Sequence, residues 1–337
     1  MDSAKKAAVI GAGAWGTALA WAMAANGASV KLWTRKPEAV ALINSERENR
    51  LYLPGAHLPE NLAATSDETA AVSGCDIVIV AIPTQFMRKA LAGFAGLIPE
   101  DAIIVSASKG VENETLALPV DIISQTLGEK IAGNVCCLSG PSFARELVNK
   151  LPTAATLASK NETAARTAQK FISSGFFRLY VHRDVTGVEL GGALKNVIAI
   201  AAGISDGLGF GHNTRAALIT RGLMEIRRLG VAMGAEAETF SGLSGMGDLV
   251  LTCTGDLSRN RTVGVRLGQG ETLSAIQASM TAVAEGVATS LSAFRLAEKH
   301  NVDTPIVTEV FKVLYENKSP KQAVADLMGR ELKSEFY

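Results

Sequence analysis

The chain has 337 residues, and its 33 lysines and arginines balance its 33 aspartates and glutamates, so the formal net charge is zero. No basic stripe or acidic tail is present, which argues against nucleic acid and anionic membrane surfaces as main partners. Hydrophobic residues make up 47% of the chain and charged residues 20%, enough for a large core. The length predicts about two domains.

The cysteines and the N-terminus indicate the cellular compartment. None of the four cysteines forms a CxxC pair or has zinc spacing, so no metal site is expected. Buried thiols in a reducing cytoplasm are the natural interpretation. Lys5 and Lys6 precede an apolar run, but glycines break it, and no apolar stretch reaches membrane-spanning length. We therefore expect a cytoplasmic protein with no integral membrane segment.

The first predicted elements are a strand, a glycine turn and a helix. The apolar run 7–10 leads into Gly11-Ala12-Gly13-Ala14-Trp15-Gly16, and an alanine-rich helix is predicted over 17–26. This context makes the glycine pattern a dinucleotide-binding fingerprint. Gly11 suits the tight turn, Gly13 the close approach of a pyrophosphate, and Gly16 the packing of helix on strand. The anion would lie over free N–H groups at the helix N-terminus.

The second predicted strand, 29–33, bears on the choice of cofactor. An NAD-specific site carries Asp or Glu at the end of this strand to bond the ribose hydroxyls. Here the strand ends in Thr34-Arg35-Lys36, where two cations suit a 2′-phosphate. We expect NADPH to be accepted and preferred, with NADH as the other possible cofactor. The alternative is a solvated loop with two surface cations.

Further strands are predicted around 77–80, 103–105, 135–138, 153–157 and 177–180. They are continuously apolar, which is typical of a sheet covered by helices on both faces. From Gly187 to Glu331 the pattern is helical, with almost no β-rich run. We predict an α/β protein with an N-terminal Rossmann-like doubly wound sheet over 1–188 and a mainly α-helical C-terminal domain over 189–337. The substrate should lie in the cleft between them.

Lys195 is the best candidate for acid–base chemistry. The histidines stand alone, and no Tyr-x-x-x-Lys pair is present. Lys195 lies in GGALKNVIAIAAG, residues 191–203, a predicted helix almost free of charge. Burial there would lower its pKa toward the range of a working acid or base. The alternative is a lysine that extends its head group to solvent from an apolar face.

A second segment, 245–261, supports a site around this lysine. Asp248 follows a glycine-loosened loop and could pair with a charged lysine, while Arg259 and Asn260 offer hydrogen-bond donors to a phosphate monoester. A surface loop with solvated arginines is the alternative. The turns at 106–110 and 139–144 follow predicted strands, and ligands bind at that edge of open α/β sheets.

With these segments in view, the chain closely resembles the soluble bacterial NAD(P)-dependent glycerol-3-phosphate dehydrogenases nearly end to end. The resemblance rests on GAGAWGTALA at 11–20, YLPG at 52–55, SASKGVE at 106–112, LSGPSFARE at 138–146, the long lysine segment 191–222, the arginine segment 242–261 and VAEG at 283–286. It implies NAD(P)H-linked reduction of dihydroxyacetone phosphate, a phosphorylated triose, to sn-glycerol 3-phosphate for phospholipid synthesis, and the reverse reaction. A homodimer is also implied.

The resemblance implies a role for each matching residue. Lys195 would exchange a proton with the substrate oxygen, supported by Asp248. The implied substrate-binding residues are Lys109, Gly140, Ser142, Lys195, Asp248, Ser258, Arg259 and Asn260. The implied cofactor-binding residues, beyond the glycines of the turn, are Ala14, Trp15, Arg35, Lys109, Ala144, Arg259, Val283 and Glu285.

Two alternatives remain. A β-hydroxyacid or 6-phosphogluconate type of dehydrogenase also joins a Rossmann domain to a helical domain with a lysine, and tends to show Gly-x-x-x-Lys-x-x-x-Asn. Here Gly191 precedes Lys195 correctly, but Ala199 stands where Asn is expected. A non-catalytic NADPH-binding sensor would need only residues of the first domain, and the presence of Lys195, Asp248 and the Arg259-Asn260 pair argues against it.

Overall fold

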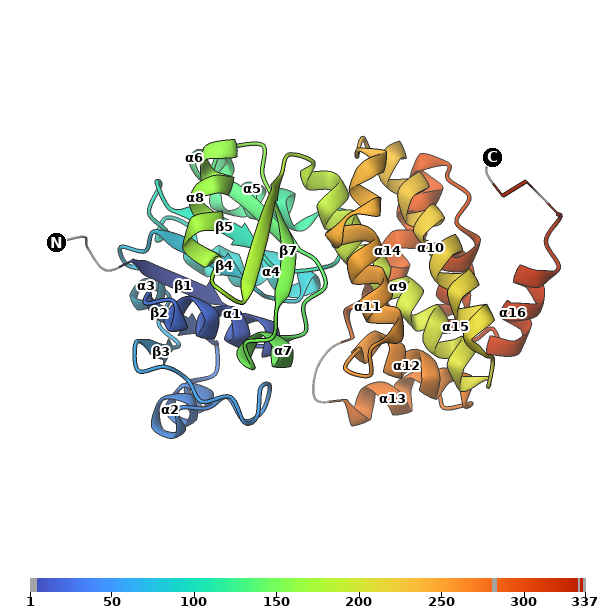
Figure 1. The fold of residues 1–337 in the computed structure, drawn as a ribbon, viewed down its shortest axis with the longest axis horizontal. Coiled ribbons are helices and arrows are strands. Elements are labelled where there is room, and N and C mark those ends of the chain that lie inside the picture. Colours follow the sequence, from blue (N-terminus) through green and yellow to red (C-terminus); the bar gives the residue numbers. More distant parts are fainter. Residues whose placement is uncertain (1–4, 281–283, 333, 336–337) are drawn as a thin grey trace.

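The computed structural model describes residues 5–280, 284–332 and 334–335, and it consists of a sheet-containing unit beside a helical unit (Figure 1). The sheet of the first unit has the order β3-β2-β1-β4-β5-β6-β7-β8. The strands are β1 (Lys6–Ile10), β2 (Ser29–Trp33), β3 (Leu62–Thr65), β4 (Ile77–Val80), β5 (Ile103–Ser106), β6 (Val135–Ser139), β7 (Thr153–Ala158) and β8 (Phe177–His182).

The first six strands are parallel and follow the order 3-2-1-4-5-6, which is that of a dinucleotide-binding sheet. The predicted doubly wound fold is therefore confirmed. β7 runs antiparallel to β6, and β8 runs parallel to β7. Because the first six strands share one direction, the segments that follow them meet at one edge of the sheet.

Helices cover both faces of this sheet. Alternate residues of β1 point to opposite sides: Val9 joins one hydrophobic cluster with Leu19 and Met23, and Ile10 joins another with Met87 and Phe94. The helices are α1 (Ala14–Ala25), α2 (Pro37–Glu46), α3 (Glu68–Val72), α4 (Thr84–Leu91), the short 3₁₀ turn η1 (Ala92–Phe94), α5 (Pro119–Leu127), α6 (Glu129–Ala132), α7 (Ala144–Val148) and α8 (Glu162–Ile172).

Two details differ from the sequence-based predictions. The strand β3 was not predicted, because its sequence Leu-Ala-Ala-Thr holds few β-forming side chains and lies at the sheet edge beside β2. The first helix begins at Ala14, directly after Gly13, rather than at residue 17. Its N-terminus therefore lies inside the glycine turn.

The described residues of the second unit form helices joined by loops, with no strand among them. Its elements are α9 (Val185–Gly207), α10 (His212–Ala232), the 3₁₀ turn η2 (Ala237–Ser241), the π-helical turn η3 (Leu243–Gly247), α11 (Asp248–Thr254), α12 (Arg259–Gly268), α13 (Leu273–Ser279), α14 (Glu285–His300), α15 (Pro305–Tyr315) and α16 (Pro320–Met328). The last strand ends at His182 and α9 starts at Val185, so the division of the chain at 188/189 stays a prediction.

The helix α9 is the centre of the second unit. It has 23 residues and a mean hydropathy of 1.3 over its most apolar stretch, so the expectation that no apolar stretch reaches membrane-spanning length is wrong for α9. That stretch is entirely buried inside the protein. A helix that is apolar on every side is what the middle of a helical bundle requires.

Glycines let α12 lie unusually close to α9. A Cβ at Gly203 or Gly207 of α9 would come within 2.1 Å of a backbone oxygen of α12. In the other direction, a Cβ at Gly264 would lie 2.1 Å from the oxygen of Ile200, and one at Gly268 would lie 2.5 Å from that of Ile204. Only glycine fits at these four positions, so the distance between the two helices is set by sequence.

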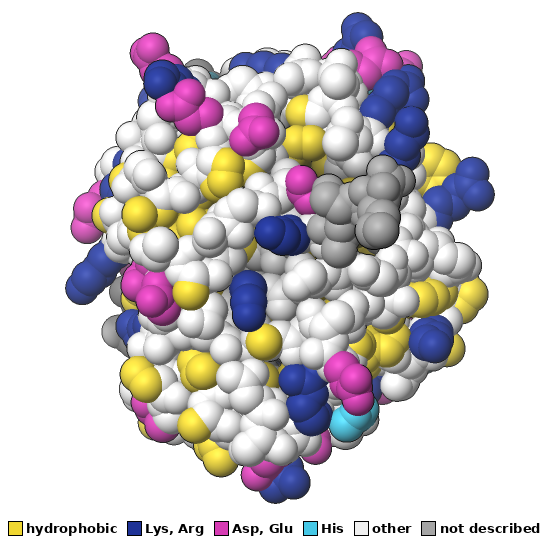
Figure 2. Space-filling model, turned by 90° about the vertical axis from the view of Figure 1, so that its left-hand side faces the viewer, with side chains coloured by type: hydrophobic (Ala, Val, Ile, Leu, Met, Phe, Trp, Pro, Cys, Tyr) yellow, Lys and Arg dark blue, Asp and Glu magenta, His cyan; other side chains and the backbone are white. Residues whose placement is uncertain are grey.

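The surface at the sheet-containing end carries mixed charge. Figure 2 shows Lys and Arg side chains interspersed with Asp and Glu, and hydrophobic side chains only in small separate groups. Near the centre of this face, neither the positively nor the negatively charged side chains form a continuous stripe. The surface therefore matches the balanced composition of the whole chain.

Candidate active site

Lys195 lies on α9, with 7% of its surface exposed. Its Nζ donates to Oδ1 of Asp248 at 2.6 Å and to the hydroxyl Oγ1 of Thr252 at 2.6 Å. The alternative of a lysine reaching out to solvent is therefore wrong. An ammonium has three N–H donors, so one remains beyond these two bonds.

Asp248 lies between two lysines. Its side chain is buried, and its second oxygen, Oδ2, accepts from Nζ of Lys109 at 2.7 Å. Lys109 follows β5 and also donates to the carbonyl oxygen of Gly140 at 3.1 Å, directly after β6. One carboxylate thus joins a lysine of the sheet edge to a lysine of the helical unit.

The local sequence explains how Asp248 reaches this position. It follows η3, a π-helical turn, and such turns are rare and frequent at functional sites. A Cβ at Gly245 would meet the backbone oxygen of Phe240 at 2.2 Å, and one at Gly191 would meet that of Ser244 at 2.6 Å. The glycines therefore allow η3 to fold tightly against α9, and Asp248 begins α11 beside Lys195.

Electrostatics make Lys195 a group that can gain and lose a proton near neutrality. Burial lowers the pKa of Lys195 to about 8. The attraction of Asp248 opposes this change, and the positive charge of Lys109 adds to it. An acid–base group works best with a pKa close to the working pH, and this pKa meets that condition.

Thr252 belongs to the same cluster and was missed by the sequence analysis. Its hydroxyl donates to the backbone oxygen of Asp248 at 2.6 Å, one turn earlier in α11. Its oxygen is then left to accept from Lys195. The spacing of four residues from Asp248 is the only sequence signal that points to Thr252, and many structural threonines share it.

The predicted Ser258-Arg259-Asn260 triplet starts α12. The hydroxyl of Ser258 accepts from the backbone N–H of Arg261 at 3.2 Å and caps the helix. Asn260 is buried; its amide donates to Oδ1 of Asn196 at 2.8 Å, and its own oxygen accepts from the N–H of Gly286 at 2.9 Å. Arg259 is exposed. The side chain of Asn260 therefore joins α9, α12 and α14.

Asn196 is a second residue that sequence reasoning missed. It follows Lys195 directly, and its amide lies 3.4 Å from the backbone oxygens of Lys109 and Gly192. It thereby ties α12 to the lysine segment. Gly140 and Ser142 follow β6, and the hydroxyl of Ser142 donates to the oxygen of Gly140 at 2.9 Å.

The glycine turn fits a dinucleotide phosphate. Gly11 has a positive φ of 117°, and a Cβ there would meet the oxygen of Ala81 at 2.5 Å. A Cβ at Gly16 would meet the oxygen of Gly11 at 1.9 Å, so that glycine is needed for packing. At Gly13 the space within 4 Å is open, and Gly13 is the N-cap of α1. An anion can therefore approach the helix N-terminus over Gly13.

Buried polar atoms without partners in the described residues support a polar ligand at this edge. They include Nε1 of Trp15 and the hydroxyls of Thr84, Ser106 and Ser139. Ser106 ends β5 and Ser139 ends β6, while Thr84 begins α4. Buried polar groups are nearly always hydrogen-bonded in a native protein, so these atoms favour a binding site there.

The other predicted cofactor residues come from several different elements of the chain. Arg35 is exposed just beyond β2, and Ala144 starts α7. Burial raises the pKa of Glu285, at the start of α14, to about 7, and the charge of Arg259 opposes that change. The charge of Arg259 therefore acts on Glu285. Val283 lies outside the described residues.

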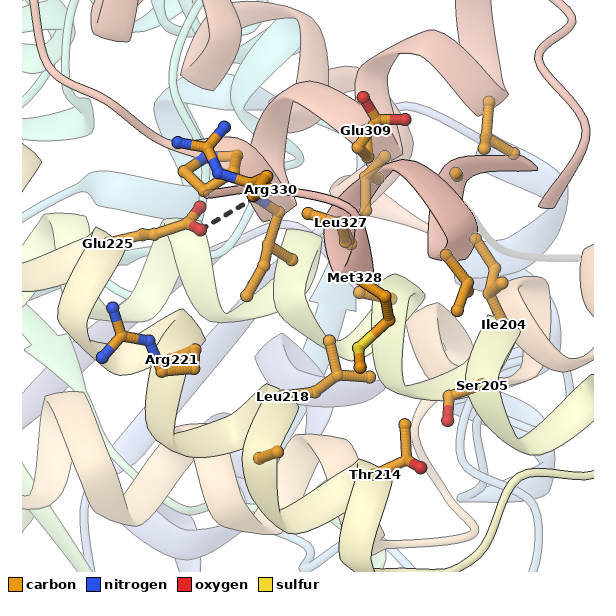
Figure 3. Close-up of a pocket in the computed structure, with 18 of the residues that line it drawn as sticks. Ile204, Ser205, Thr214, Leu218, Arg221, Glu225, Glu309, Leu327, Met328 and Arg330 are labelled. Atoms are coloured by element: carbon orange, nitrogen blue, oxygen red, sulfur yellow. Dashed lines mark hydrogen bonds between the residues drawn. The ribbon is translucent and has the colours of Figure 1, made fainter. Parts of the chain in front are cut away.

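A cavity of about 570 Å³ opens elsewhere, between α9, α10, α15 and α16. Figure 3 shows Leu218, Leu327 and Met328 along it, with Arg221, Glu225 and Arg330 toward one end. Neither Lys195 nor Asp248 lines it. The cavity is therefore separate from the lysine cluster.

Comparison with known proteins agrees with this geometry. Residues 6–165 match the N-terminal part of NAD-dependent glycerol-3-phosphate dehydrogenase, and residues 184–325 match the C-terminal part. A glycerol-3-phosphate dehydrogenase of the NAD(P)+ type from Citrifermentans bemidjiense is 55% identical over 332 residues, which cover 98% of this chain and 99% of that protein. One from Trichlorobacter lovleyi is 56% identical over 330 residues, covering 98% and 99%.

A solved structure is similar over the same length. The crystal structure of glycerol-3-phosphate dehydrogenase from Coxiella burnetii has a TM-score of 0.92 and 38% identity, and the match covers 97% of this chain and 99% of that one. Both units of the fold are included in the match. The chain belongs to the NAD-dependent glycerol-3-phosphate dehydrogenase family.

Proposed function

We propose that this protein is an oxidoreductase that reduces dihydroxyacetone phosphate to sn-glycerol 3-phosphate with NADPH or NADH, and that it also catalyses the reverse reaction. The observation that carries the proposal is the Lys109–Asp248–Lys195 cluster at the same sheet edge as the glycine turn. The names of the relatives support the substrate. In the cell the product would serve glycerophospholipid synthesis.

Lys195 is the proton donor in this proposal. Two of its N–H groups are held by Asp248 and Thr252, and the third is free to bond the substrate carbonyl oxygen. When bound, the nicotinamide supplies the hydride to the carbonyl carbon. Lys195 gives its proton to the oxygen as the hydroxyl forms, and neutral Lys195 takes that proton back in the reverse direction. Asp248 holds the ammonium in place throughout.

The remaining residues bind and orient. Lys109, Gly140 and Ser142 would line one side of the substrate, with Ser258, Arg259 and Asn260 on the other. Arg259 is suited to the phosphate because its planar guanidinium can bond two oxygens. Binding energy from that remote phosphate can then orient the reacting carbon. Asn260 acts mainly by fixing the start of α12, because both ends of its amide are engaged.

The cofactor would lie along the sheet edge. Gly11, Gly13, Ala14, Trp15 and Gly16 would contact the pyrophosphate side, and Lys109, Ala144, Arg259, Val283 and Glu285 would complete the site. Arg35 is exposed just past β2, where it can meet a 2′-phosphate. This supports NADPH as the preferred cofactor.

An assay of NADPH oxidation tests the proposal. We expect turnover with dihydroxyacetone phosphate and little with glyceraldehyde 3-phosphate or with the carbonyl forms of hydroxyacid-type substrates, and a parallel NADH series should give lower turnover. Lys195→Met should lower kcat by a factor of about 10² to 10⁴, because the proton donor is lost. NADPH binding, followed through the fluorescence of the nicotinamide, should stay near normal.

A matched control is Lys160→Met, since Lys160 is an exposed lysine of the first unit. It should leave kcat unchanged. If wild-type protein shows no turnover with dihydroxyacetone phosphate, the sensor interpretation gains. If Lys195→Met keeps turnover within tenfold of wild type, the role of Lys195 is wrong.

We also propose a cytoplasmic homodimer. The four cysteines are free and buried, as suits a reducing compartment. The family resemblance supports pairing through the helical unit. Sedimentation or light scattering of the purified chain would measure the oligomeric state, and a monomer mass at micromolar concentration would count against the dimer.

A further inference from the structure

Two buried helix starts of this protein carry a proline and lack a cap of their own; a third uncapped proline start among the described residues, that of α2 at Pro37, is exposed. α5 begins at Pro119, and its N-cap residue Leu118 has no side-chain oxygen. α15 begins at Pro305, and its N-cap Thr304 makes no capping hydrogen bond. Proline has no N–H, so the first donors at these helix ends come from the following residues. They need acceptors from elsewhere in the chain.

A buried glutamate from another helix supplies the acceptor in each case. For α15 it is Glu225 of α10, whose two carboxylate oxygens accept from the N–H groups of Ile306 at 2.8 Å and Val307 at 3.1 Å. In Figure 3 a dashed line marks the hydrogen bonding of Glu225 with α15. Both helices belong to the helical unit, so this contact stays within one unit.

For α5 the acceptor is Glu189, and here the contact crosses between the units. Glu189 lies on α9, is 6% exposed, and accepts from the N–H of Val120 at 2.9 Å. α5 covers the sheet, whereas α9 is the central helix of the other unit and carries Lys195 six residues further on. A carboxyl group keeps an acceptor oxygen whether or not it is ionised, so Glu189 can cap α5 in either protonation state.

The surroundings of Glu189 form a small core of their own at the junction. Val185 and Val188 of α9 pack with Cys137 of β6 and Ala158 of β7, and Val120 of α5 packs against them. The titratable groups that face Glu189 are Asp121 on α5 and Cys137 on β6. Burial in this small core raises the pKa of Glu189 to about 8.

The same end of α9 also touches the sheet edge directly. A Cβ at Gly192, three residues after Glu189, would lie 2.4 Å from the hydroxyl of Ser139 and 3.5 Å from the side chain of Lys109. Glu189 and Gly192 therefore fix the start of α9 against the first unit. Lys195 lies about 9 Å along the helix from Glu189, so its position follows from theirs.

We propose that Glu189 is a positioning residue: by capping α5 from α9 it fixes the two units against each other and sets where Lys195 lies relative to Lys109 and Gly140. The proposal rests on the function proposed above. Glu189 touches neither Lys195 nor Asp248 through any described contact, so it acts through the placement of α9. A shift of about 1 Å in a reacting group can cost a factor of 10² in rate.

The test compares Glu189→Ala with Glu225→Ala, which removes the same kind of cap without crossing the junction. Both should lower the melting temperature. Only Glu189→Ala should lower kcat for dihydroxyacetone phosphate reduction, by a factor of about 10 to 100, with NADPH binding unchanged. Glu189→Gln keeps an acceptor oxygen and should restore most of kcat.

The pH profile of kcat separates positioning from a loss of folded protein. Lys195 is faced by Asp248 and Cys253 of α11 and by Lys109 after β5, and its charge also reaches Glu285 of α14. If α9 moves, the bond to Asp248 lengthens while burial persists, so the pKa of Lys195 falls. The profile of Glu189→Ala should move to lower pH, and that of Glu225→Ala should match wild type.

Each outcome decides the question. Equal kcat and equal pH profiles for Glu189→Ala and Glu225→Ala would overturn the proposal. If Glu189→Ala does not fold, Glu189→Asp, which withdraws the carboxylate by one methylene, carries the same expectation. These comparisons require that the wild-type protein is active. If wild type shows no turnover, or if Lys195→Met is active, the proposed function is contradicted instead.

Discussion

At the scale of single residues, the cluster depends on which acceptors Lys195 has. Asp248 supplies charge, and Thr252 supplies an oxygen whose orientation is fixed because its proton goes to the backbone of Asp248. Burial, with the nearby charge of Lys109, lowers the pKa of Lys195, and these two acceptors stabilise its charged form. Reduction requires the protonated lysine, so its rate should fall as pH rises through about 8.

Thr252→Val tests this arrangement with little change in shape. A hydrogen bond to a charged group is worth about 1.5–3 kcal/mol, so kcat for reduction should fall about tenfold to a hundredfold. The loss of an acceptor should also move the falling limb of the pH profile to lower pH. Thr254→Val is the matched control, since Thr254 makes the same bond to the helix backbone but is exposed. Equal kinetics for the two variants would refute the role of Thr252.

At the scale of elements, the glycine crossing of α9 and α12 positions the start of α12, and with it Arg259. Alanine normally favours a helix over glycine, but a Cβ at Gly203 would lie 2.1 Å from the oxygen of Arg261. Gly203→Ala should therefore push the helices apart and lower the free energy of unfolding by about 1–3 kcal/mol. It should also raise KM for the phosphorylated substrate.

The control for this prediction is Gly133→Ala, where the added Cβ meets nothing within 4 Å and φ is −67°. Urea denaturation and steady-state kinetics measure both effects. Wild-type stability in Gly203→Ala would mean that the two helices can separate without cost.

At the scale of the whole molecule, buried glutamates make stability depend on pH. Burial raises the pKa of Glu225 to about 7, from an ordinary value of 4.5. The folded state then binds a proton that the unfolded state has lost, so this stability is present below pH 4.5 and is lost as pH rises through about 7. The raised pKa of Glu189 has the same effect, so its contribution to stability is lost as pH rises through about 8.

We therefore expect wild-type protein to be less stable at pH 8 than at pH 5. Because glutamine does not titrate, Glu225→Gln should lose less free energy of unfolding than wild type between pH 5 and pH 8. The difference should be on the order of 3 kcal/mol at most. Urea denaturation at both pH values measures the difference. An identical pH dependence in wild type and Glu225→Gln would show that Glu225 does not titrate in this range.

The features that could be predicted are those that a short stretch of the sequence determines by itself. The glycine turn, most of the sheet and the isolated charge of Lys195 in an apolar helix were all visible. Thr252, Asn196 and Glu189 were not, because each acts through a contact between elements far apart in the chain. From the sequence, the side-chain amide of Asn260 was expected to bind a ligand. In the structure this amide bonds to Asn196 and Gly286, which lie on two other helices.

The composition of α9 has a consequence for reading related genomes. A hydropathy search would mark this helix as a membrane anchor, and the Gly203-x-x-x-Gly207 spacing would strengthen that error, since such spacing is typical of paired membrane helices. The lysine in its middle and the matching glycines of α12 tell the two cases apart. Topology assignments for such chains should therefore weigh a single apolar helix against the glycine pairs of a later, polar one.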